Sequence, residues 1–264
     1  MKKIFAIANQ KGGIGKTTTA ISMSAILNRL GHKTLLIDCD PSGYATDTFQ
    51  AEINGVATLY DVIMNERERS PLEEAIQETD CGYIVASDPL LKRADFLCAG
   101  DPDAVYGLRE AIESARSRGA LDDFEYIIID SPPLAVTLLN ICLIAAEEVI
   151  IPVTPDRYAV KGLSDFNNTI KAIRKRSNPN LHVYGLLMVM IDPRLKIYKG
   201  TKDTLISFAN ALDTKVLPTA IRRSVVAAEA QTSRQTLLDF SPGCSTELDY
   251  EAFVDLILEE SEDE

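Results

Sequence analysis

The chain alternates short apolar runs with longer segments in which apolar residues recur at helical spacing. Strand-like runs lie near residues 4, 34, 83, 127, 149 and 183, and segments of helical length separate them. After Thr17, the residues Ala20, Met23, Leu27 and Leu30 follow at spacings that predict one buried stripe along a helix. This rhythm predicts a doubly wound α/β fold, with a mostly parallel sheet and helices on both faces.

Length and composition favour one domain. The chain has 264 residues, of which 46% are hydrophobic, enough to fill a core between a sheet and two helix layers. No linker, repeat or low-complexity tract interrupts it. We expect residues 1–258 to form a single domain and the acidic residues 259–264 to form a disordered tail.

A glycine-rich loop follows the first strand-like run, which covers Ile4 to Ala8. Its glycines let the backbone curl with its N–H groups inward, and the helix that follows adds partial positive charge. We therefore predict a phosphate-binding loop, in which Lys16 binds the β- and γ-phosphates and Thr17 offers a hydroxyl to Mg²⁺. The residues expected to contact the nucleotide are Gly12, Gly13, Ile14, Gly15, Lys16, Thr17 and Thr18.

Two carboxylates close the second strand-like run, Thr34 to Ile37. Asp38 and Asp40 lie at its carboxyl end, before a turn that contains Pro41 and Gly43. In open α/β sheets this edge is where ligands bind, and side chains two residues apart on an extended chain share a side. One carboxylate can serve Mg²⁺ while the other orients a water molecule for attack on the γ-phosphate.

A third carboxylate ends a fully apolar run. Tyr126 to Ile129 reads as a strand buried on both faces, and Asp130 follows it directly. We expect Asp130 to hold Mg²⁺ through water.

The loop sequence KGGIGKTT, Lys11 to Thr18, resembles the ParA/MinD group of P-loop ATPases with a deviant Walker A motif, and its ParA/Soj partition branch in particular. The resemblance implies ATP and Mg²⁺ as cofactors and an ATP-bound homodimer in which Lys11 reaches the partner's nucleotide. It also implies that Asp40 activates the water and that Asp38 lies on the magnesium side. Ser42 and Tyr44 depart from the family's DxDPQGN pattern at its glutamine and asparagine.

The same resemblance implies where the adenine is bound. It assigns contacts near the strand end at Met190 to Asp192 and near Pro218.

The charge is distributed unevenly along the chain. The net charge is −12, yet residues 157–234 carry 14 Lys/Arg against 5 Asp/Glu. A local basic field can hold phosphates in a manner that is independent of sequence and sensitive to salt, although a solvated basic face is the alternative. Because the resembled family binds DNA nonspecifically through basic residues in this part of the chain, we expect DNA contacts from Arg194, Lys196, Lys199, Arg222 and Arg223.

Other functions within the fold make distinct predictions. A MinD-like positioning ATPase would carry a basic membrane-binding C-terminal helix, but residues 246–264 hold nine acidic residues and no Lys or Arg. A P-loop metabolic ligase remains possible on fold alone.

The five cysteines show no CxxC or Cys/His pairing, so we expect neither a metal cluster nor disulfides. No apolar stretch is long enough for a secretory signal or a membrane span, which predicts a cytoplasmic protein. The resemblance implies that it is nucleoid-associated. The family implies a ParB-like adaptor, and the cargo stays open.

Overall fold

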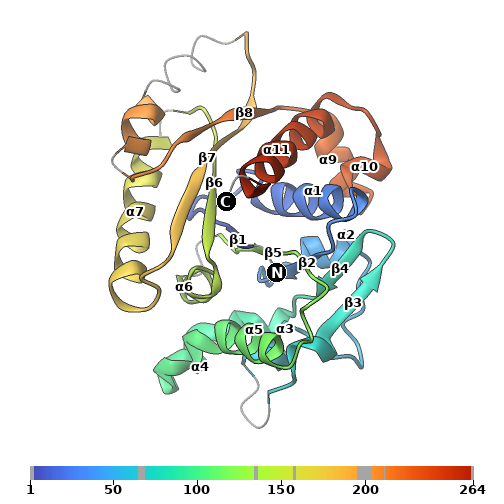
Figure 1. Ribbon diagram of the computed structural model, residues 1–264, viewed down its shortest axis with the longest axis vertical. Helices are drawn as coiled ribbons and strands as arrows, with labels where there is room; N and C mark the ends of the chain where they lie inside the picture. Colours follow the sequence, from blue (N-terminus) through green and yellow to red (C-terminus); the bar gives the residue numbers. More distant parts are fainter. Residues whose placement is uncertain are drawn as a thin grey trace.

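One sheet organises the chain in the computed structural model (Figure 1), which describes residues 3–64, 69–133, 136–156, 159–194, 204–210 and 212–262. Within these residues the sheet has eight strands in the order β3-β4-β2-β5-β1-β6-β7-β8. β3 and β4 form an antiparallel hairpin at one edge, and all other neighbouring strands pair in parallel. The strands are β1 (Lys3–Ile7), β2 (Thr34–Asp38), β3 (Ile76–Thr79), β4 (Gly82–Val85), β5 (Tyr126–Asp130), β6 (Glu148–Val153), β7 (His182–Ile191) and β8 (Val216–Arg222).

Helices cover both faces of the sheet (Figure 1). One face packs against α1 (Lys16–Arg29), α2 (Tyr44–Thr48), α9 (Val225–Thr232), α10 (Leu237–Phe240) and α11 (Ser245–Glu262). The other face packs against α3 (Leu59–Ile63), α4 (Ala94–Gly100), α5 (Gly107–Ser117), α6 (Val136–Ala145) and α7 (Ala159–Arg176). The short 3₁₀ helices are η1 (Leu72–Ala75), η2 (Pro89–Arg93) and η3 (Pro102–Tyr106).

The central strand β1 shows why the strand sequences are apolar throughout. Ile4 and Ala6 enter the core on one face, whereas Phe5 and Ile7 enter the core on the other. All four side chains are buried, because a parallel strand with helices on both faces has no solvent side. The predicted α/β fold with a mostly parallel sheet is therefore confirmed.

The position of β1 creates the ligand-binding crevice. β1 lies between β5 and β6 and continues into α1 on one face, whereas β5 and β6 continue into α6 and α7 on the other. Where neighbouring strands lead to helices on opposite faces, their carboxyl ends leave a crevice between the connections. The glycine-rich loop after β1 opens into this crevice.

Two local expectations differ from the structure. Leu30 is 51% exposed, because α1 ends at Arg29 and the side chain of its C-cap residue no longer faces the core. Residues 259–262 of the expected disordered tail are helical, since α11 runs through Glu262. Among the described residues, no helix combines the length and apolarity needed to cross a bilayer.

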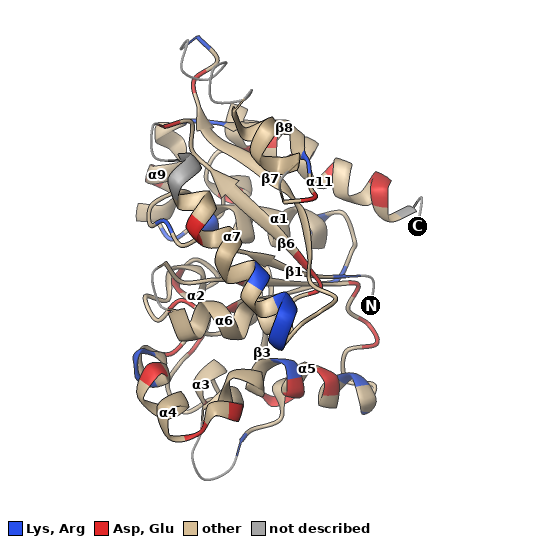
Figure 2. Cartoon of the chain, turned by 90° about the vertical axis from the view of Figure 1, so that its left-hand side faces the viewer, with Lys and Arg blue, Asp and Glu red and all other residues tan. Residues whose placement is uncertain are grey.

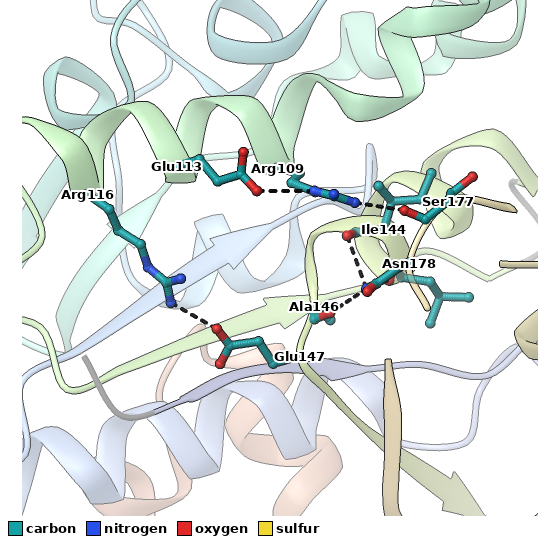
Figure 3. A network of polar contacts seen from close by, with 9 residues as sticks. Arg109, Glu113, Arg116, Ile144, Ala146, Glu147, Ser177 and Asn178 are labelled. Carbon is teal, nitrogen blue, oxygen red and sulfur yellow. Dashed lines mark hydrogen bonds and ion pairs between the residues drawn. The ribbon is translucent and has the colours of Figure 1, made fainter. Parts of the chain in front are cut away.

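Asn178 fixes α6 at the edge of the sheet opposite the loop (Figure 3). This buried side chain donates from Nδ2 to the carbonyl oxygens of Leu143 at 3.0 Å, Ile144 at 3.2 Å and Ala146 at 2.7 Å. Carbonyl groups at a helix C-terminus have no partner within the helix, so one amide group satisfies the end of α6. The helix that begins just after β5 is thereby held at its far end.

Glu147 ties three elements together beside this cap (Figure 3). Its carboxylate accepts a hydrogen bond from the backbone N–H of Ile4 at 3.0 Å and one from Arg116 of α5 at 3.1 Å. One carboxylate therefore anchors the starts of β1 and β6 to the end of α5, at the end of the sheet opposite the glycine-rich loop.

Candidate functional site

The glycine-rich loop joins β1 to α1 through two left-handed residues. Gly13 has φ 68° and Gly15 has φ 77°, values that side chains other than that of glycine rarely tolerate. Gly15 is the N-cap of α1, and Ile14 is buried beneath the loop. Thr17 and Thr18 lie in the first turn of the helix, half-buried. The loop thus presents the positive end of a helix of 14 residues to the crevice.

Lys16 is buried inside the loop. Its Nζ donates to the carbonyl oxygen of Lys11 at 3.1 Å. Burial lowers the pKa of this ammonium group, and the neighbouring carboxylates of Asp130 and Asp40 oppose that shift. An ammonium group with little solvent and one backbone partner is suited to bind an anion such as phosphate.

Asp130 has the environment expected of a ligand for a bound cation. Both carboxylate oxygens are buried, and neither accepts a well-formed hydrogen bond from the described residues, although the hydroxyl of Thr17 approaches them. Burial, and then the charge of Asp38, raises the pKa of Asp130 well above its usual range, while Thr17 and Lys16 lower it. Buried charged oxygens without partners are costly, so this carboxylate fits a site for Mg²⁺ or its water ligands.

Few acidic side chains are grouped closely enough at this site to surround an ion. In the part of the chain that the structure describes, no group of three or more His, Cys, Asp or Glu side chains could hold a metal by itself. Mg²⁺ bound to one or two carboxylates takes its remaining ligands from water and substrate phosphates. The arrangement therefore fits magnesium that arrives together with a nucleotide.

Asp38 differs from Asp130 because protein donors satisfy it. Oδ2 accepts from the backbone N–H and the hydroxyl of Thr46, both at 2.8 Å, and Oδ1 accepts from the backbone N–H of Asp40 at 3.1 Å. Burial raises the pKa of Asp38 to about 6 against the effect of these donors. The structure thus gives Asp38 the contacts of a residue that holds the end of β2 in place.

Asp40 lies on the turn after β2, close to Lys16. Its Oδ1 accepts from the backbone N–H of Ser42 at 2.9 Å, and its side chain is nearly buried. Its carbonyl oxygen accepts from the hydroxyl of Ser87 at 2.6 Å. Thr46 and Ser87 were not predicted from the sequence; the available signal for Ser87 was a polar residue two positions after the carboxyl end of a strand.

Lys11 is held within its own chain. Its Nζ donates to Asp156 in an ion pair and to the hydroxyl of Thr154 at 3.1 Å. Its backbone N–H donates to Asn9, whose amide is in turn bound to the carbonyl of Pro152 at 2.9 Å. The side chains of Lys11 and Asp156 are 38% and 36% exposed, so the pair faces solvent at the rim of the crevice.

The residues expected around the adenine have different environments in the structure. Met190 has φ 54°, and a Cβ on Gly15 would lie 3.6 Å from its Cε, so its side chain reaches over the loop. The carboxylate of Asp192 is occupied by Arg194 at 2.8 Å, which lowers the pKa of Asp192 to about 2. Pro218 is exposed within the edge strand β8, four residues before its end.

The basic residues expected to contact DNA are partly engaged by the protein. Arg194 pairs with Asp192, and Arg222 pairs with Asp249 at 2.7 Å. The side chain of Arg223 is exposed and has no ion pair with any residue that the structure describes. Lys196 and Lys199 lie outside the described residues.

Comparisons with known proteins agree with this geometry. A family model described as an AAA domain matches residues 2–183. The chromosome-partitioning ATPase Soj of Thermus thermophilus is 34% identical over 90% of this chain and 88% of its own length. The sporulation initiation inhibitor protein Soj of Bacillus subtilis is 31% identical over 92% of both chains.

A solved structure shares the architecture. Cobyrinic acid a,c-diamide synthase from Mycobacterium smegmatis, with bound ADP and magnesium, superposes with a TM-score of 0.79 at 27% identity, covering 98% of this chain and 94% of that one. The family model and the relatives above 30% identity decide the family, and nucleotide with magnesium is bound in a structure of the same fold. The chain therefore belongs to the ParA/Soj family of P-loop ATPases, and its cofactors are ATP and Mg²⁺.

Proposed function

We propose that this ATPase is a dimerising switch, in which ATP joins two copies face to face and hydrolysis separates them. The observation that carries the proposal is the second lysine of the loop. Lys16 fills the interior of the loop, so the phosphate-binding role is complete without Lys11. Lys11 lies at the rim and is 38% exposed, where it can leave Asp156 and reach a nucleotide in an apposed copy.

Different residues of this chain have different roles in the proposed hydrolysis. The loop amides and Lys16 hold the phosphates, while Thr17 and Asp130 hold the metal side, with Asp38 supporting the end of β2. Asp40 accepts a proton or hydrogen bond from the attacking water and so orients it. When bound, Mg²⁺ neutralises phosphate charge and aligns the phosphates for in-line attack. The environments of Lys16 and Asp130 support this division, because each is a buried ionisable group with few hydrogen-bond partners among the described residues.

Exposed apolar side chains support a protein partner at the crevice. Large apolar residues usually leave water, and a group of them around one edge is typical of an interface. Side chains of this kind occur at the carboxyl edge of the sheet. Met190 lies one residue before the end of β7, and the segments that follow β2, β4, β5 and β8 carry Tyr44, Leu90, Phe96, Val136 and Val225. A second copy placed over this edge would cover them and bring Lys11 to the opposite loop.

The basic segment is proposed to bind DNA without sequence preference. The last turn of α7 carries Arg174, Lys175 and Arg176, a basic group visible in Figure 2. With the exposed Arg223, this group provides cations that can contact phosphates and release counterions. We propose a cytoplasmic, nucleoid-associated protein whose hydrolysis a ParB-like adaptor stimulates, and which positions or partitions DNA or another cargo.

Sedimentation with ATP tests the switch. All chains in this test carry Asp40→Ala, which we expect to trap the ATP dimer. The chain with this substitution alone should dimerise with ATP. The chain that also carries Lys11→Ala should still bind ATP but stay monomeric. Lys16→Ala should bind no nucleotide. Lys33→Ala is the matched control, because Lys33 precedes β2 at the opposite edge of the sheet.

The outcomes separate the candidate functions. A Lys11→Ala variant that dimerises with ATP as well as the parent would remove the role of Lys11 across the dimer. ATP turnover that requires a small carboxylic acid substrate and does not change when DNA is added would favour a P-loop ligase. This class is considered because the fold is similar to that of a diamide synthase.

A further inference from the structure

A ring of four buried polar residues surrounds the start of the turn that carries Asp40. Asp38 accepts two hydrogen bonds from Thr46, and the hydroxyl of Thr46 accepts from the backbone N–H of Ser87 at 2.8 Å. The hydroxyl of Ser87 donates to the carbonyl of Asp40 at 2.6 Å, and the N–H of Asp40 returns to Asp38 at 3.1 Å. All four side chains are less than 9% exposed.

Ser87 is the member of this ring that comes from another strand. It follows β4, which pairs with β2 in parallel, so its hydroxyl reaches across the sheet edge to the turn. The carbonyl of Asp40 also accepts from the N–H of Gly43 at 2.9 Å, a bond local to the turn. The bond from Ser87 is therefore the contact that fixes this carbonyl to the rest of the sheet.

We propose that Ser87 is a positioning residue for hydrolysis, which holds Asp40 at the place from which it orients the attacking water. This inference rests on the proposed role of Asp40. The loss of a buried O–H···O bond costs free energy, and among the described residues the carbonyl of Asp40 then keeps its local bond from Gly43. Reaction rates are sensitive to displacements of about 1 Å in such groups. Lys16 and Asp130 lie close to the two carboxylates of the ring, but among the described residues no hydrogen bond joins either of them to Ser87.

The same bond links Asp40 to an exposed apolar segment. Ser87 leads into η2 and α4, where Leu90 is 46% and Phe96 is 71% exposed. Asp88, next to Ser87, caps η2 by accepting from the backbone N–H of Leu90 at 2.7 Å. Ser87 therefore connects the turn that carries Asp40 to a segment with exposed apolar side chains.

The test compares Ser87→Ala with a matched serine substitution. Ser24→Ala is the control, because Ser24 is equally buried on α1 but its hydroxyl has no partner among the described residues. We expect Ser87→Ala to lower kcat for ATP about tenfold and to leave KM and the dissociation constant for ATP unchanged within about twofold. Ser24→Ala should keep the parent kcat, and Ser87→Thr, which retains the hydroxyl, should recover most of the lost rate. Circular dichroism and thermal melting show that each variant is folded at the assay temperature.

Each result has one meaning. A Ser87→Ala variant with the parent kcat, measured beside an inactive Asp40→Ala variant, overturns the role of Ser87 and leaves the proposed function intact. An equal rise in KM and loss of ATP affinity would assign Ser87 to binding and also overturn the inference. An Asp40→Ala variant that hydrolyses ATP at the parent rate would instead overturn the proposed role of Asp40, and the role of Ser87 with it.

Discussion

Lys11 and Asp156 form an ion pair within one protomer, at the rim of the phosphate-binding loop. Lys11 must break its ion pair with Asp156 before its ammonium group can contact the nucleotide bound to a partner. The hydroxyl of Thr154 adds a second contact at 3.1 Å, so the isolated protomer holds the side chain in a defined place. The pair therefore competes with dimerisation in the proposed switch.

Asp156→Asn is expected to strengthen the ATP-dependent dimer. The substitution removes the charge that holds Lys11 while keeping the shape of the side chain. Because both side chains are more than one third exposed, each pair contributes at most about 1 kcal/mol. A dimer breaks two pairs, so its dissociation constant should fall by at most about thirtyfold. Sedimentation velocity with ATP in an Asp40→Ala background measures it. Asp123→Asn, which removes the partner of Lys33, is the control, and a weaker Asp156→Asn dimer would count against competition.

Asp130→Asn is expected to stabilise the nucleotide-free chain while abolishing hydrolysis. It replaces two buried carboxylate oxygens without partners by a neutral amide, which should raise the free energy of unfolding by about 1–3 kcal/mol at neutral pH. Urea unfolding without nucleotide or magnesium measures this difference.

The effect of Asp130→Asn should depend on pH in one direction. Burial raises the pKa of Asp130 in the folded state, so above about pH 4, where the unfolded group ionises, the folded parent binds more protons than the unfolded chain. The stability of the parent then falls as pH rises, and the advantage of the variant grows between pH 5 and pH 8. Equal stability of the two chains at pH 8 would show that the buried charge is satisfied.

Asn178→Ala is expected to destabilise the fold without changing the affinity for ATP. It leaves three carbonyl groups at the end of α6 without their shared donor, at a cost of about 2–3 kcal/mol. Denaturant unfolding and nucleotide titration provide the two readouts. A large loss of ATP affinity in folded protein would mean that α6 transmits strain to the loop.

Arg223 is expected to contribute more to DNA retention than Arg222. The guanidinium group of Arg222 is bound to Asp249 at 2.7 Å and to the carbonyl of Ser245 at 2.9 Å, whereas Arg223 is exposed. Arg223→Ala should weaken binding to DNA of any sequence and reduce the slope of log affinity against log salt by about 1. Arg222→Ala should mainly lower thermal stability. Binding by fluorescence anisotropy at several salt concentrations measures the slopes, and the reverse order would return Arg222 to the interface.

Local patterns predicted the parallel sheet well and its edge poorly. Strands such as β1 and β5 are buried on both faces, so their apolar runs are unambiguous. β3, in contrast, is polar and half-exposed, and its antiparallel pairing with β4 depends on a turn whose Gly82 has φ 123°. The exposure of Leu30 likewise depends on where α1 ends, which helical spacing alone does not determine.

The site shows the same division between local and distant contacts. The positions of the loop glycines, Lys16 and Asp130 were predictable, because the glycines come between β1 and α1, Lys16 opens α1 and Asp130 ends β5. Ser87 and Asp156 were not, since each acts on a residue more than forty positions away through a contact that only the assembled sheet creates. Thr46 lies nearer in sequence, but its role depends on the turn that returns it to Asp38.

A crystal structure of the Asp40→Ala variant with ATP and Mg²⁺ tests the dimerising switch most directly. The account predicts a two-fold dimer joined at the carboxyl edge of the sheet, with Lys11 released from Asp156 and its Nζ within hydrogen-bond distance of the phosphates bound to the partner. An ATP-bound chain in which Lys11 stays on Asp156, or contacts only its own nucleotide, would contradict it.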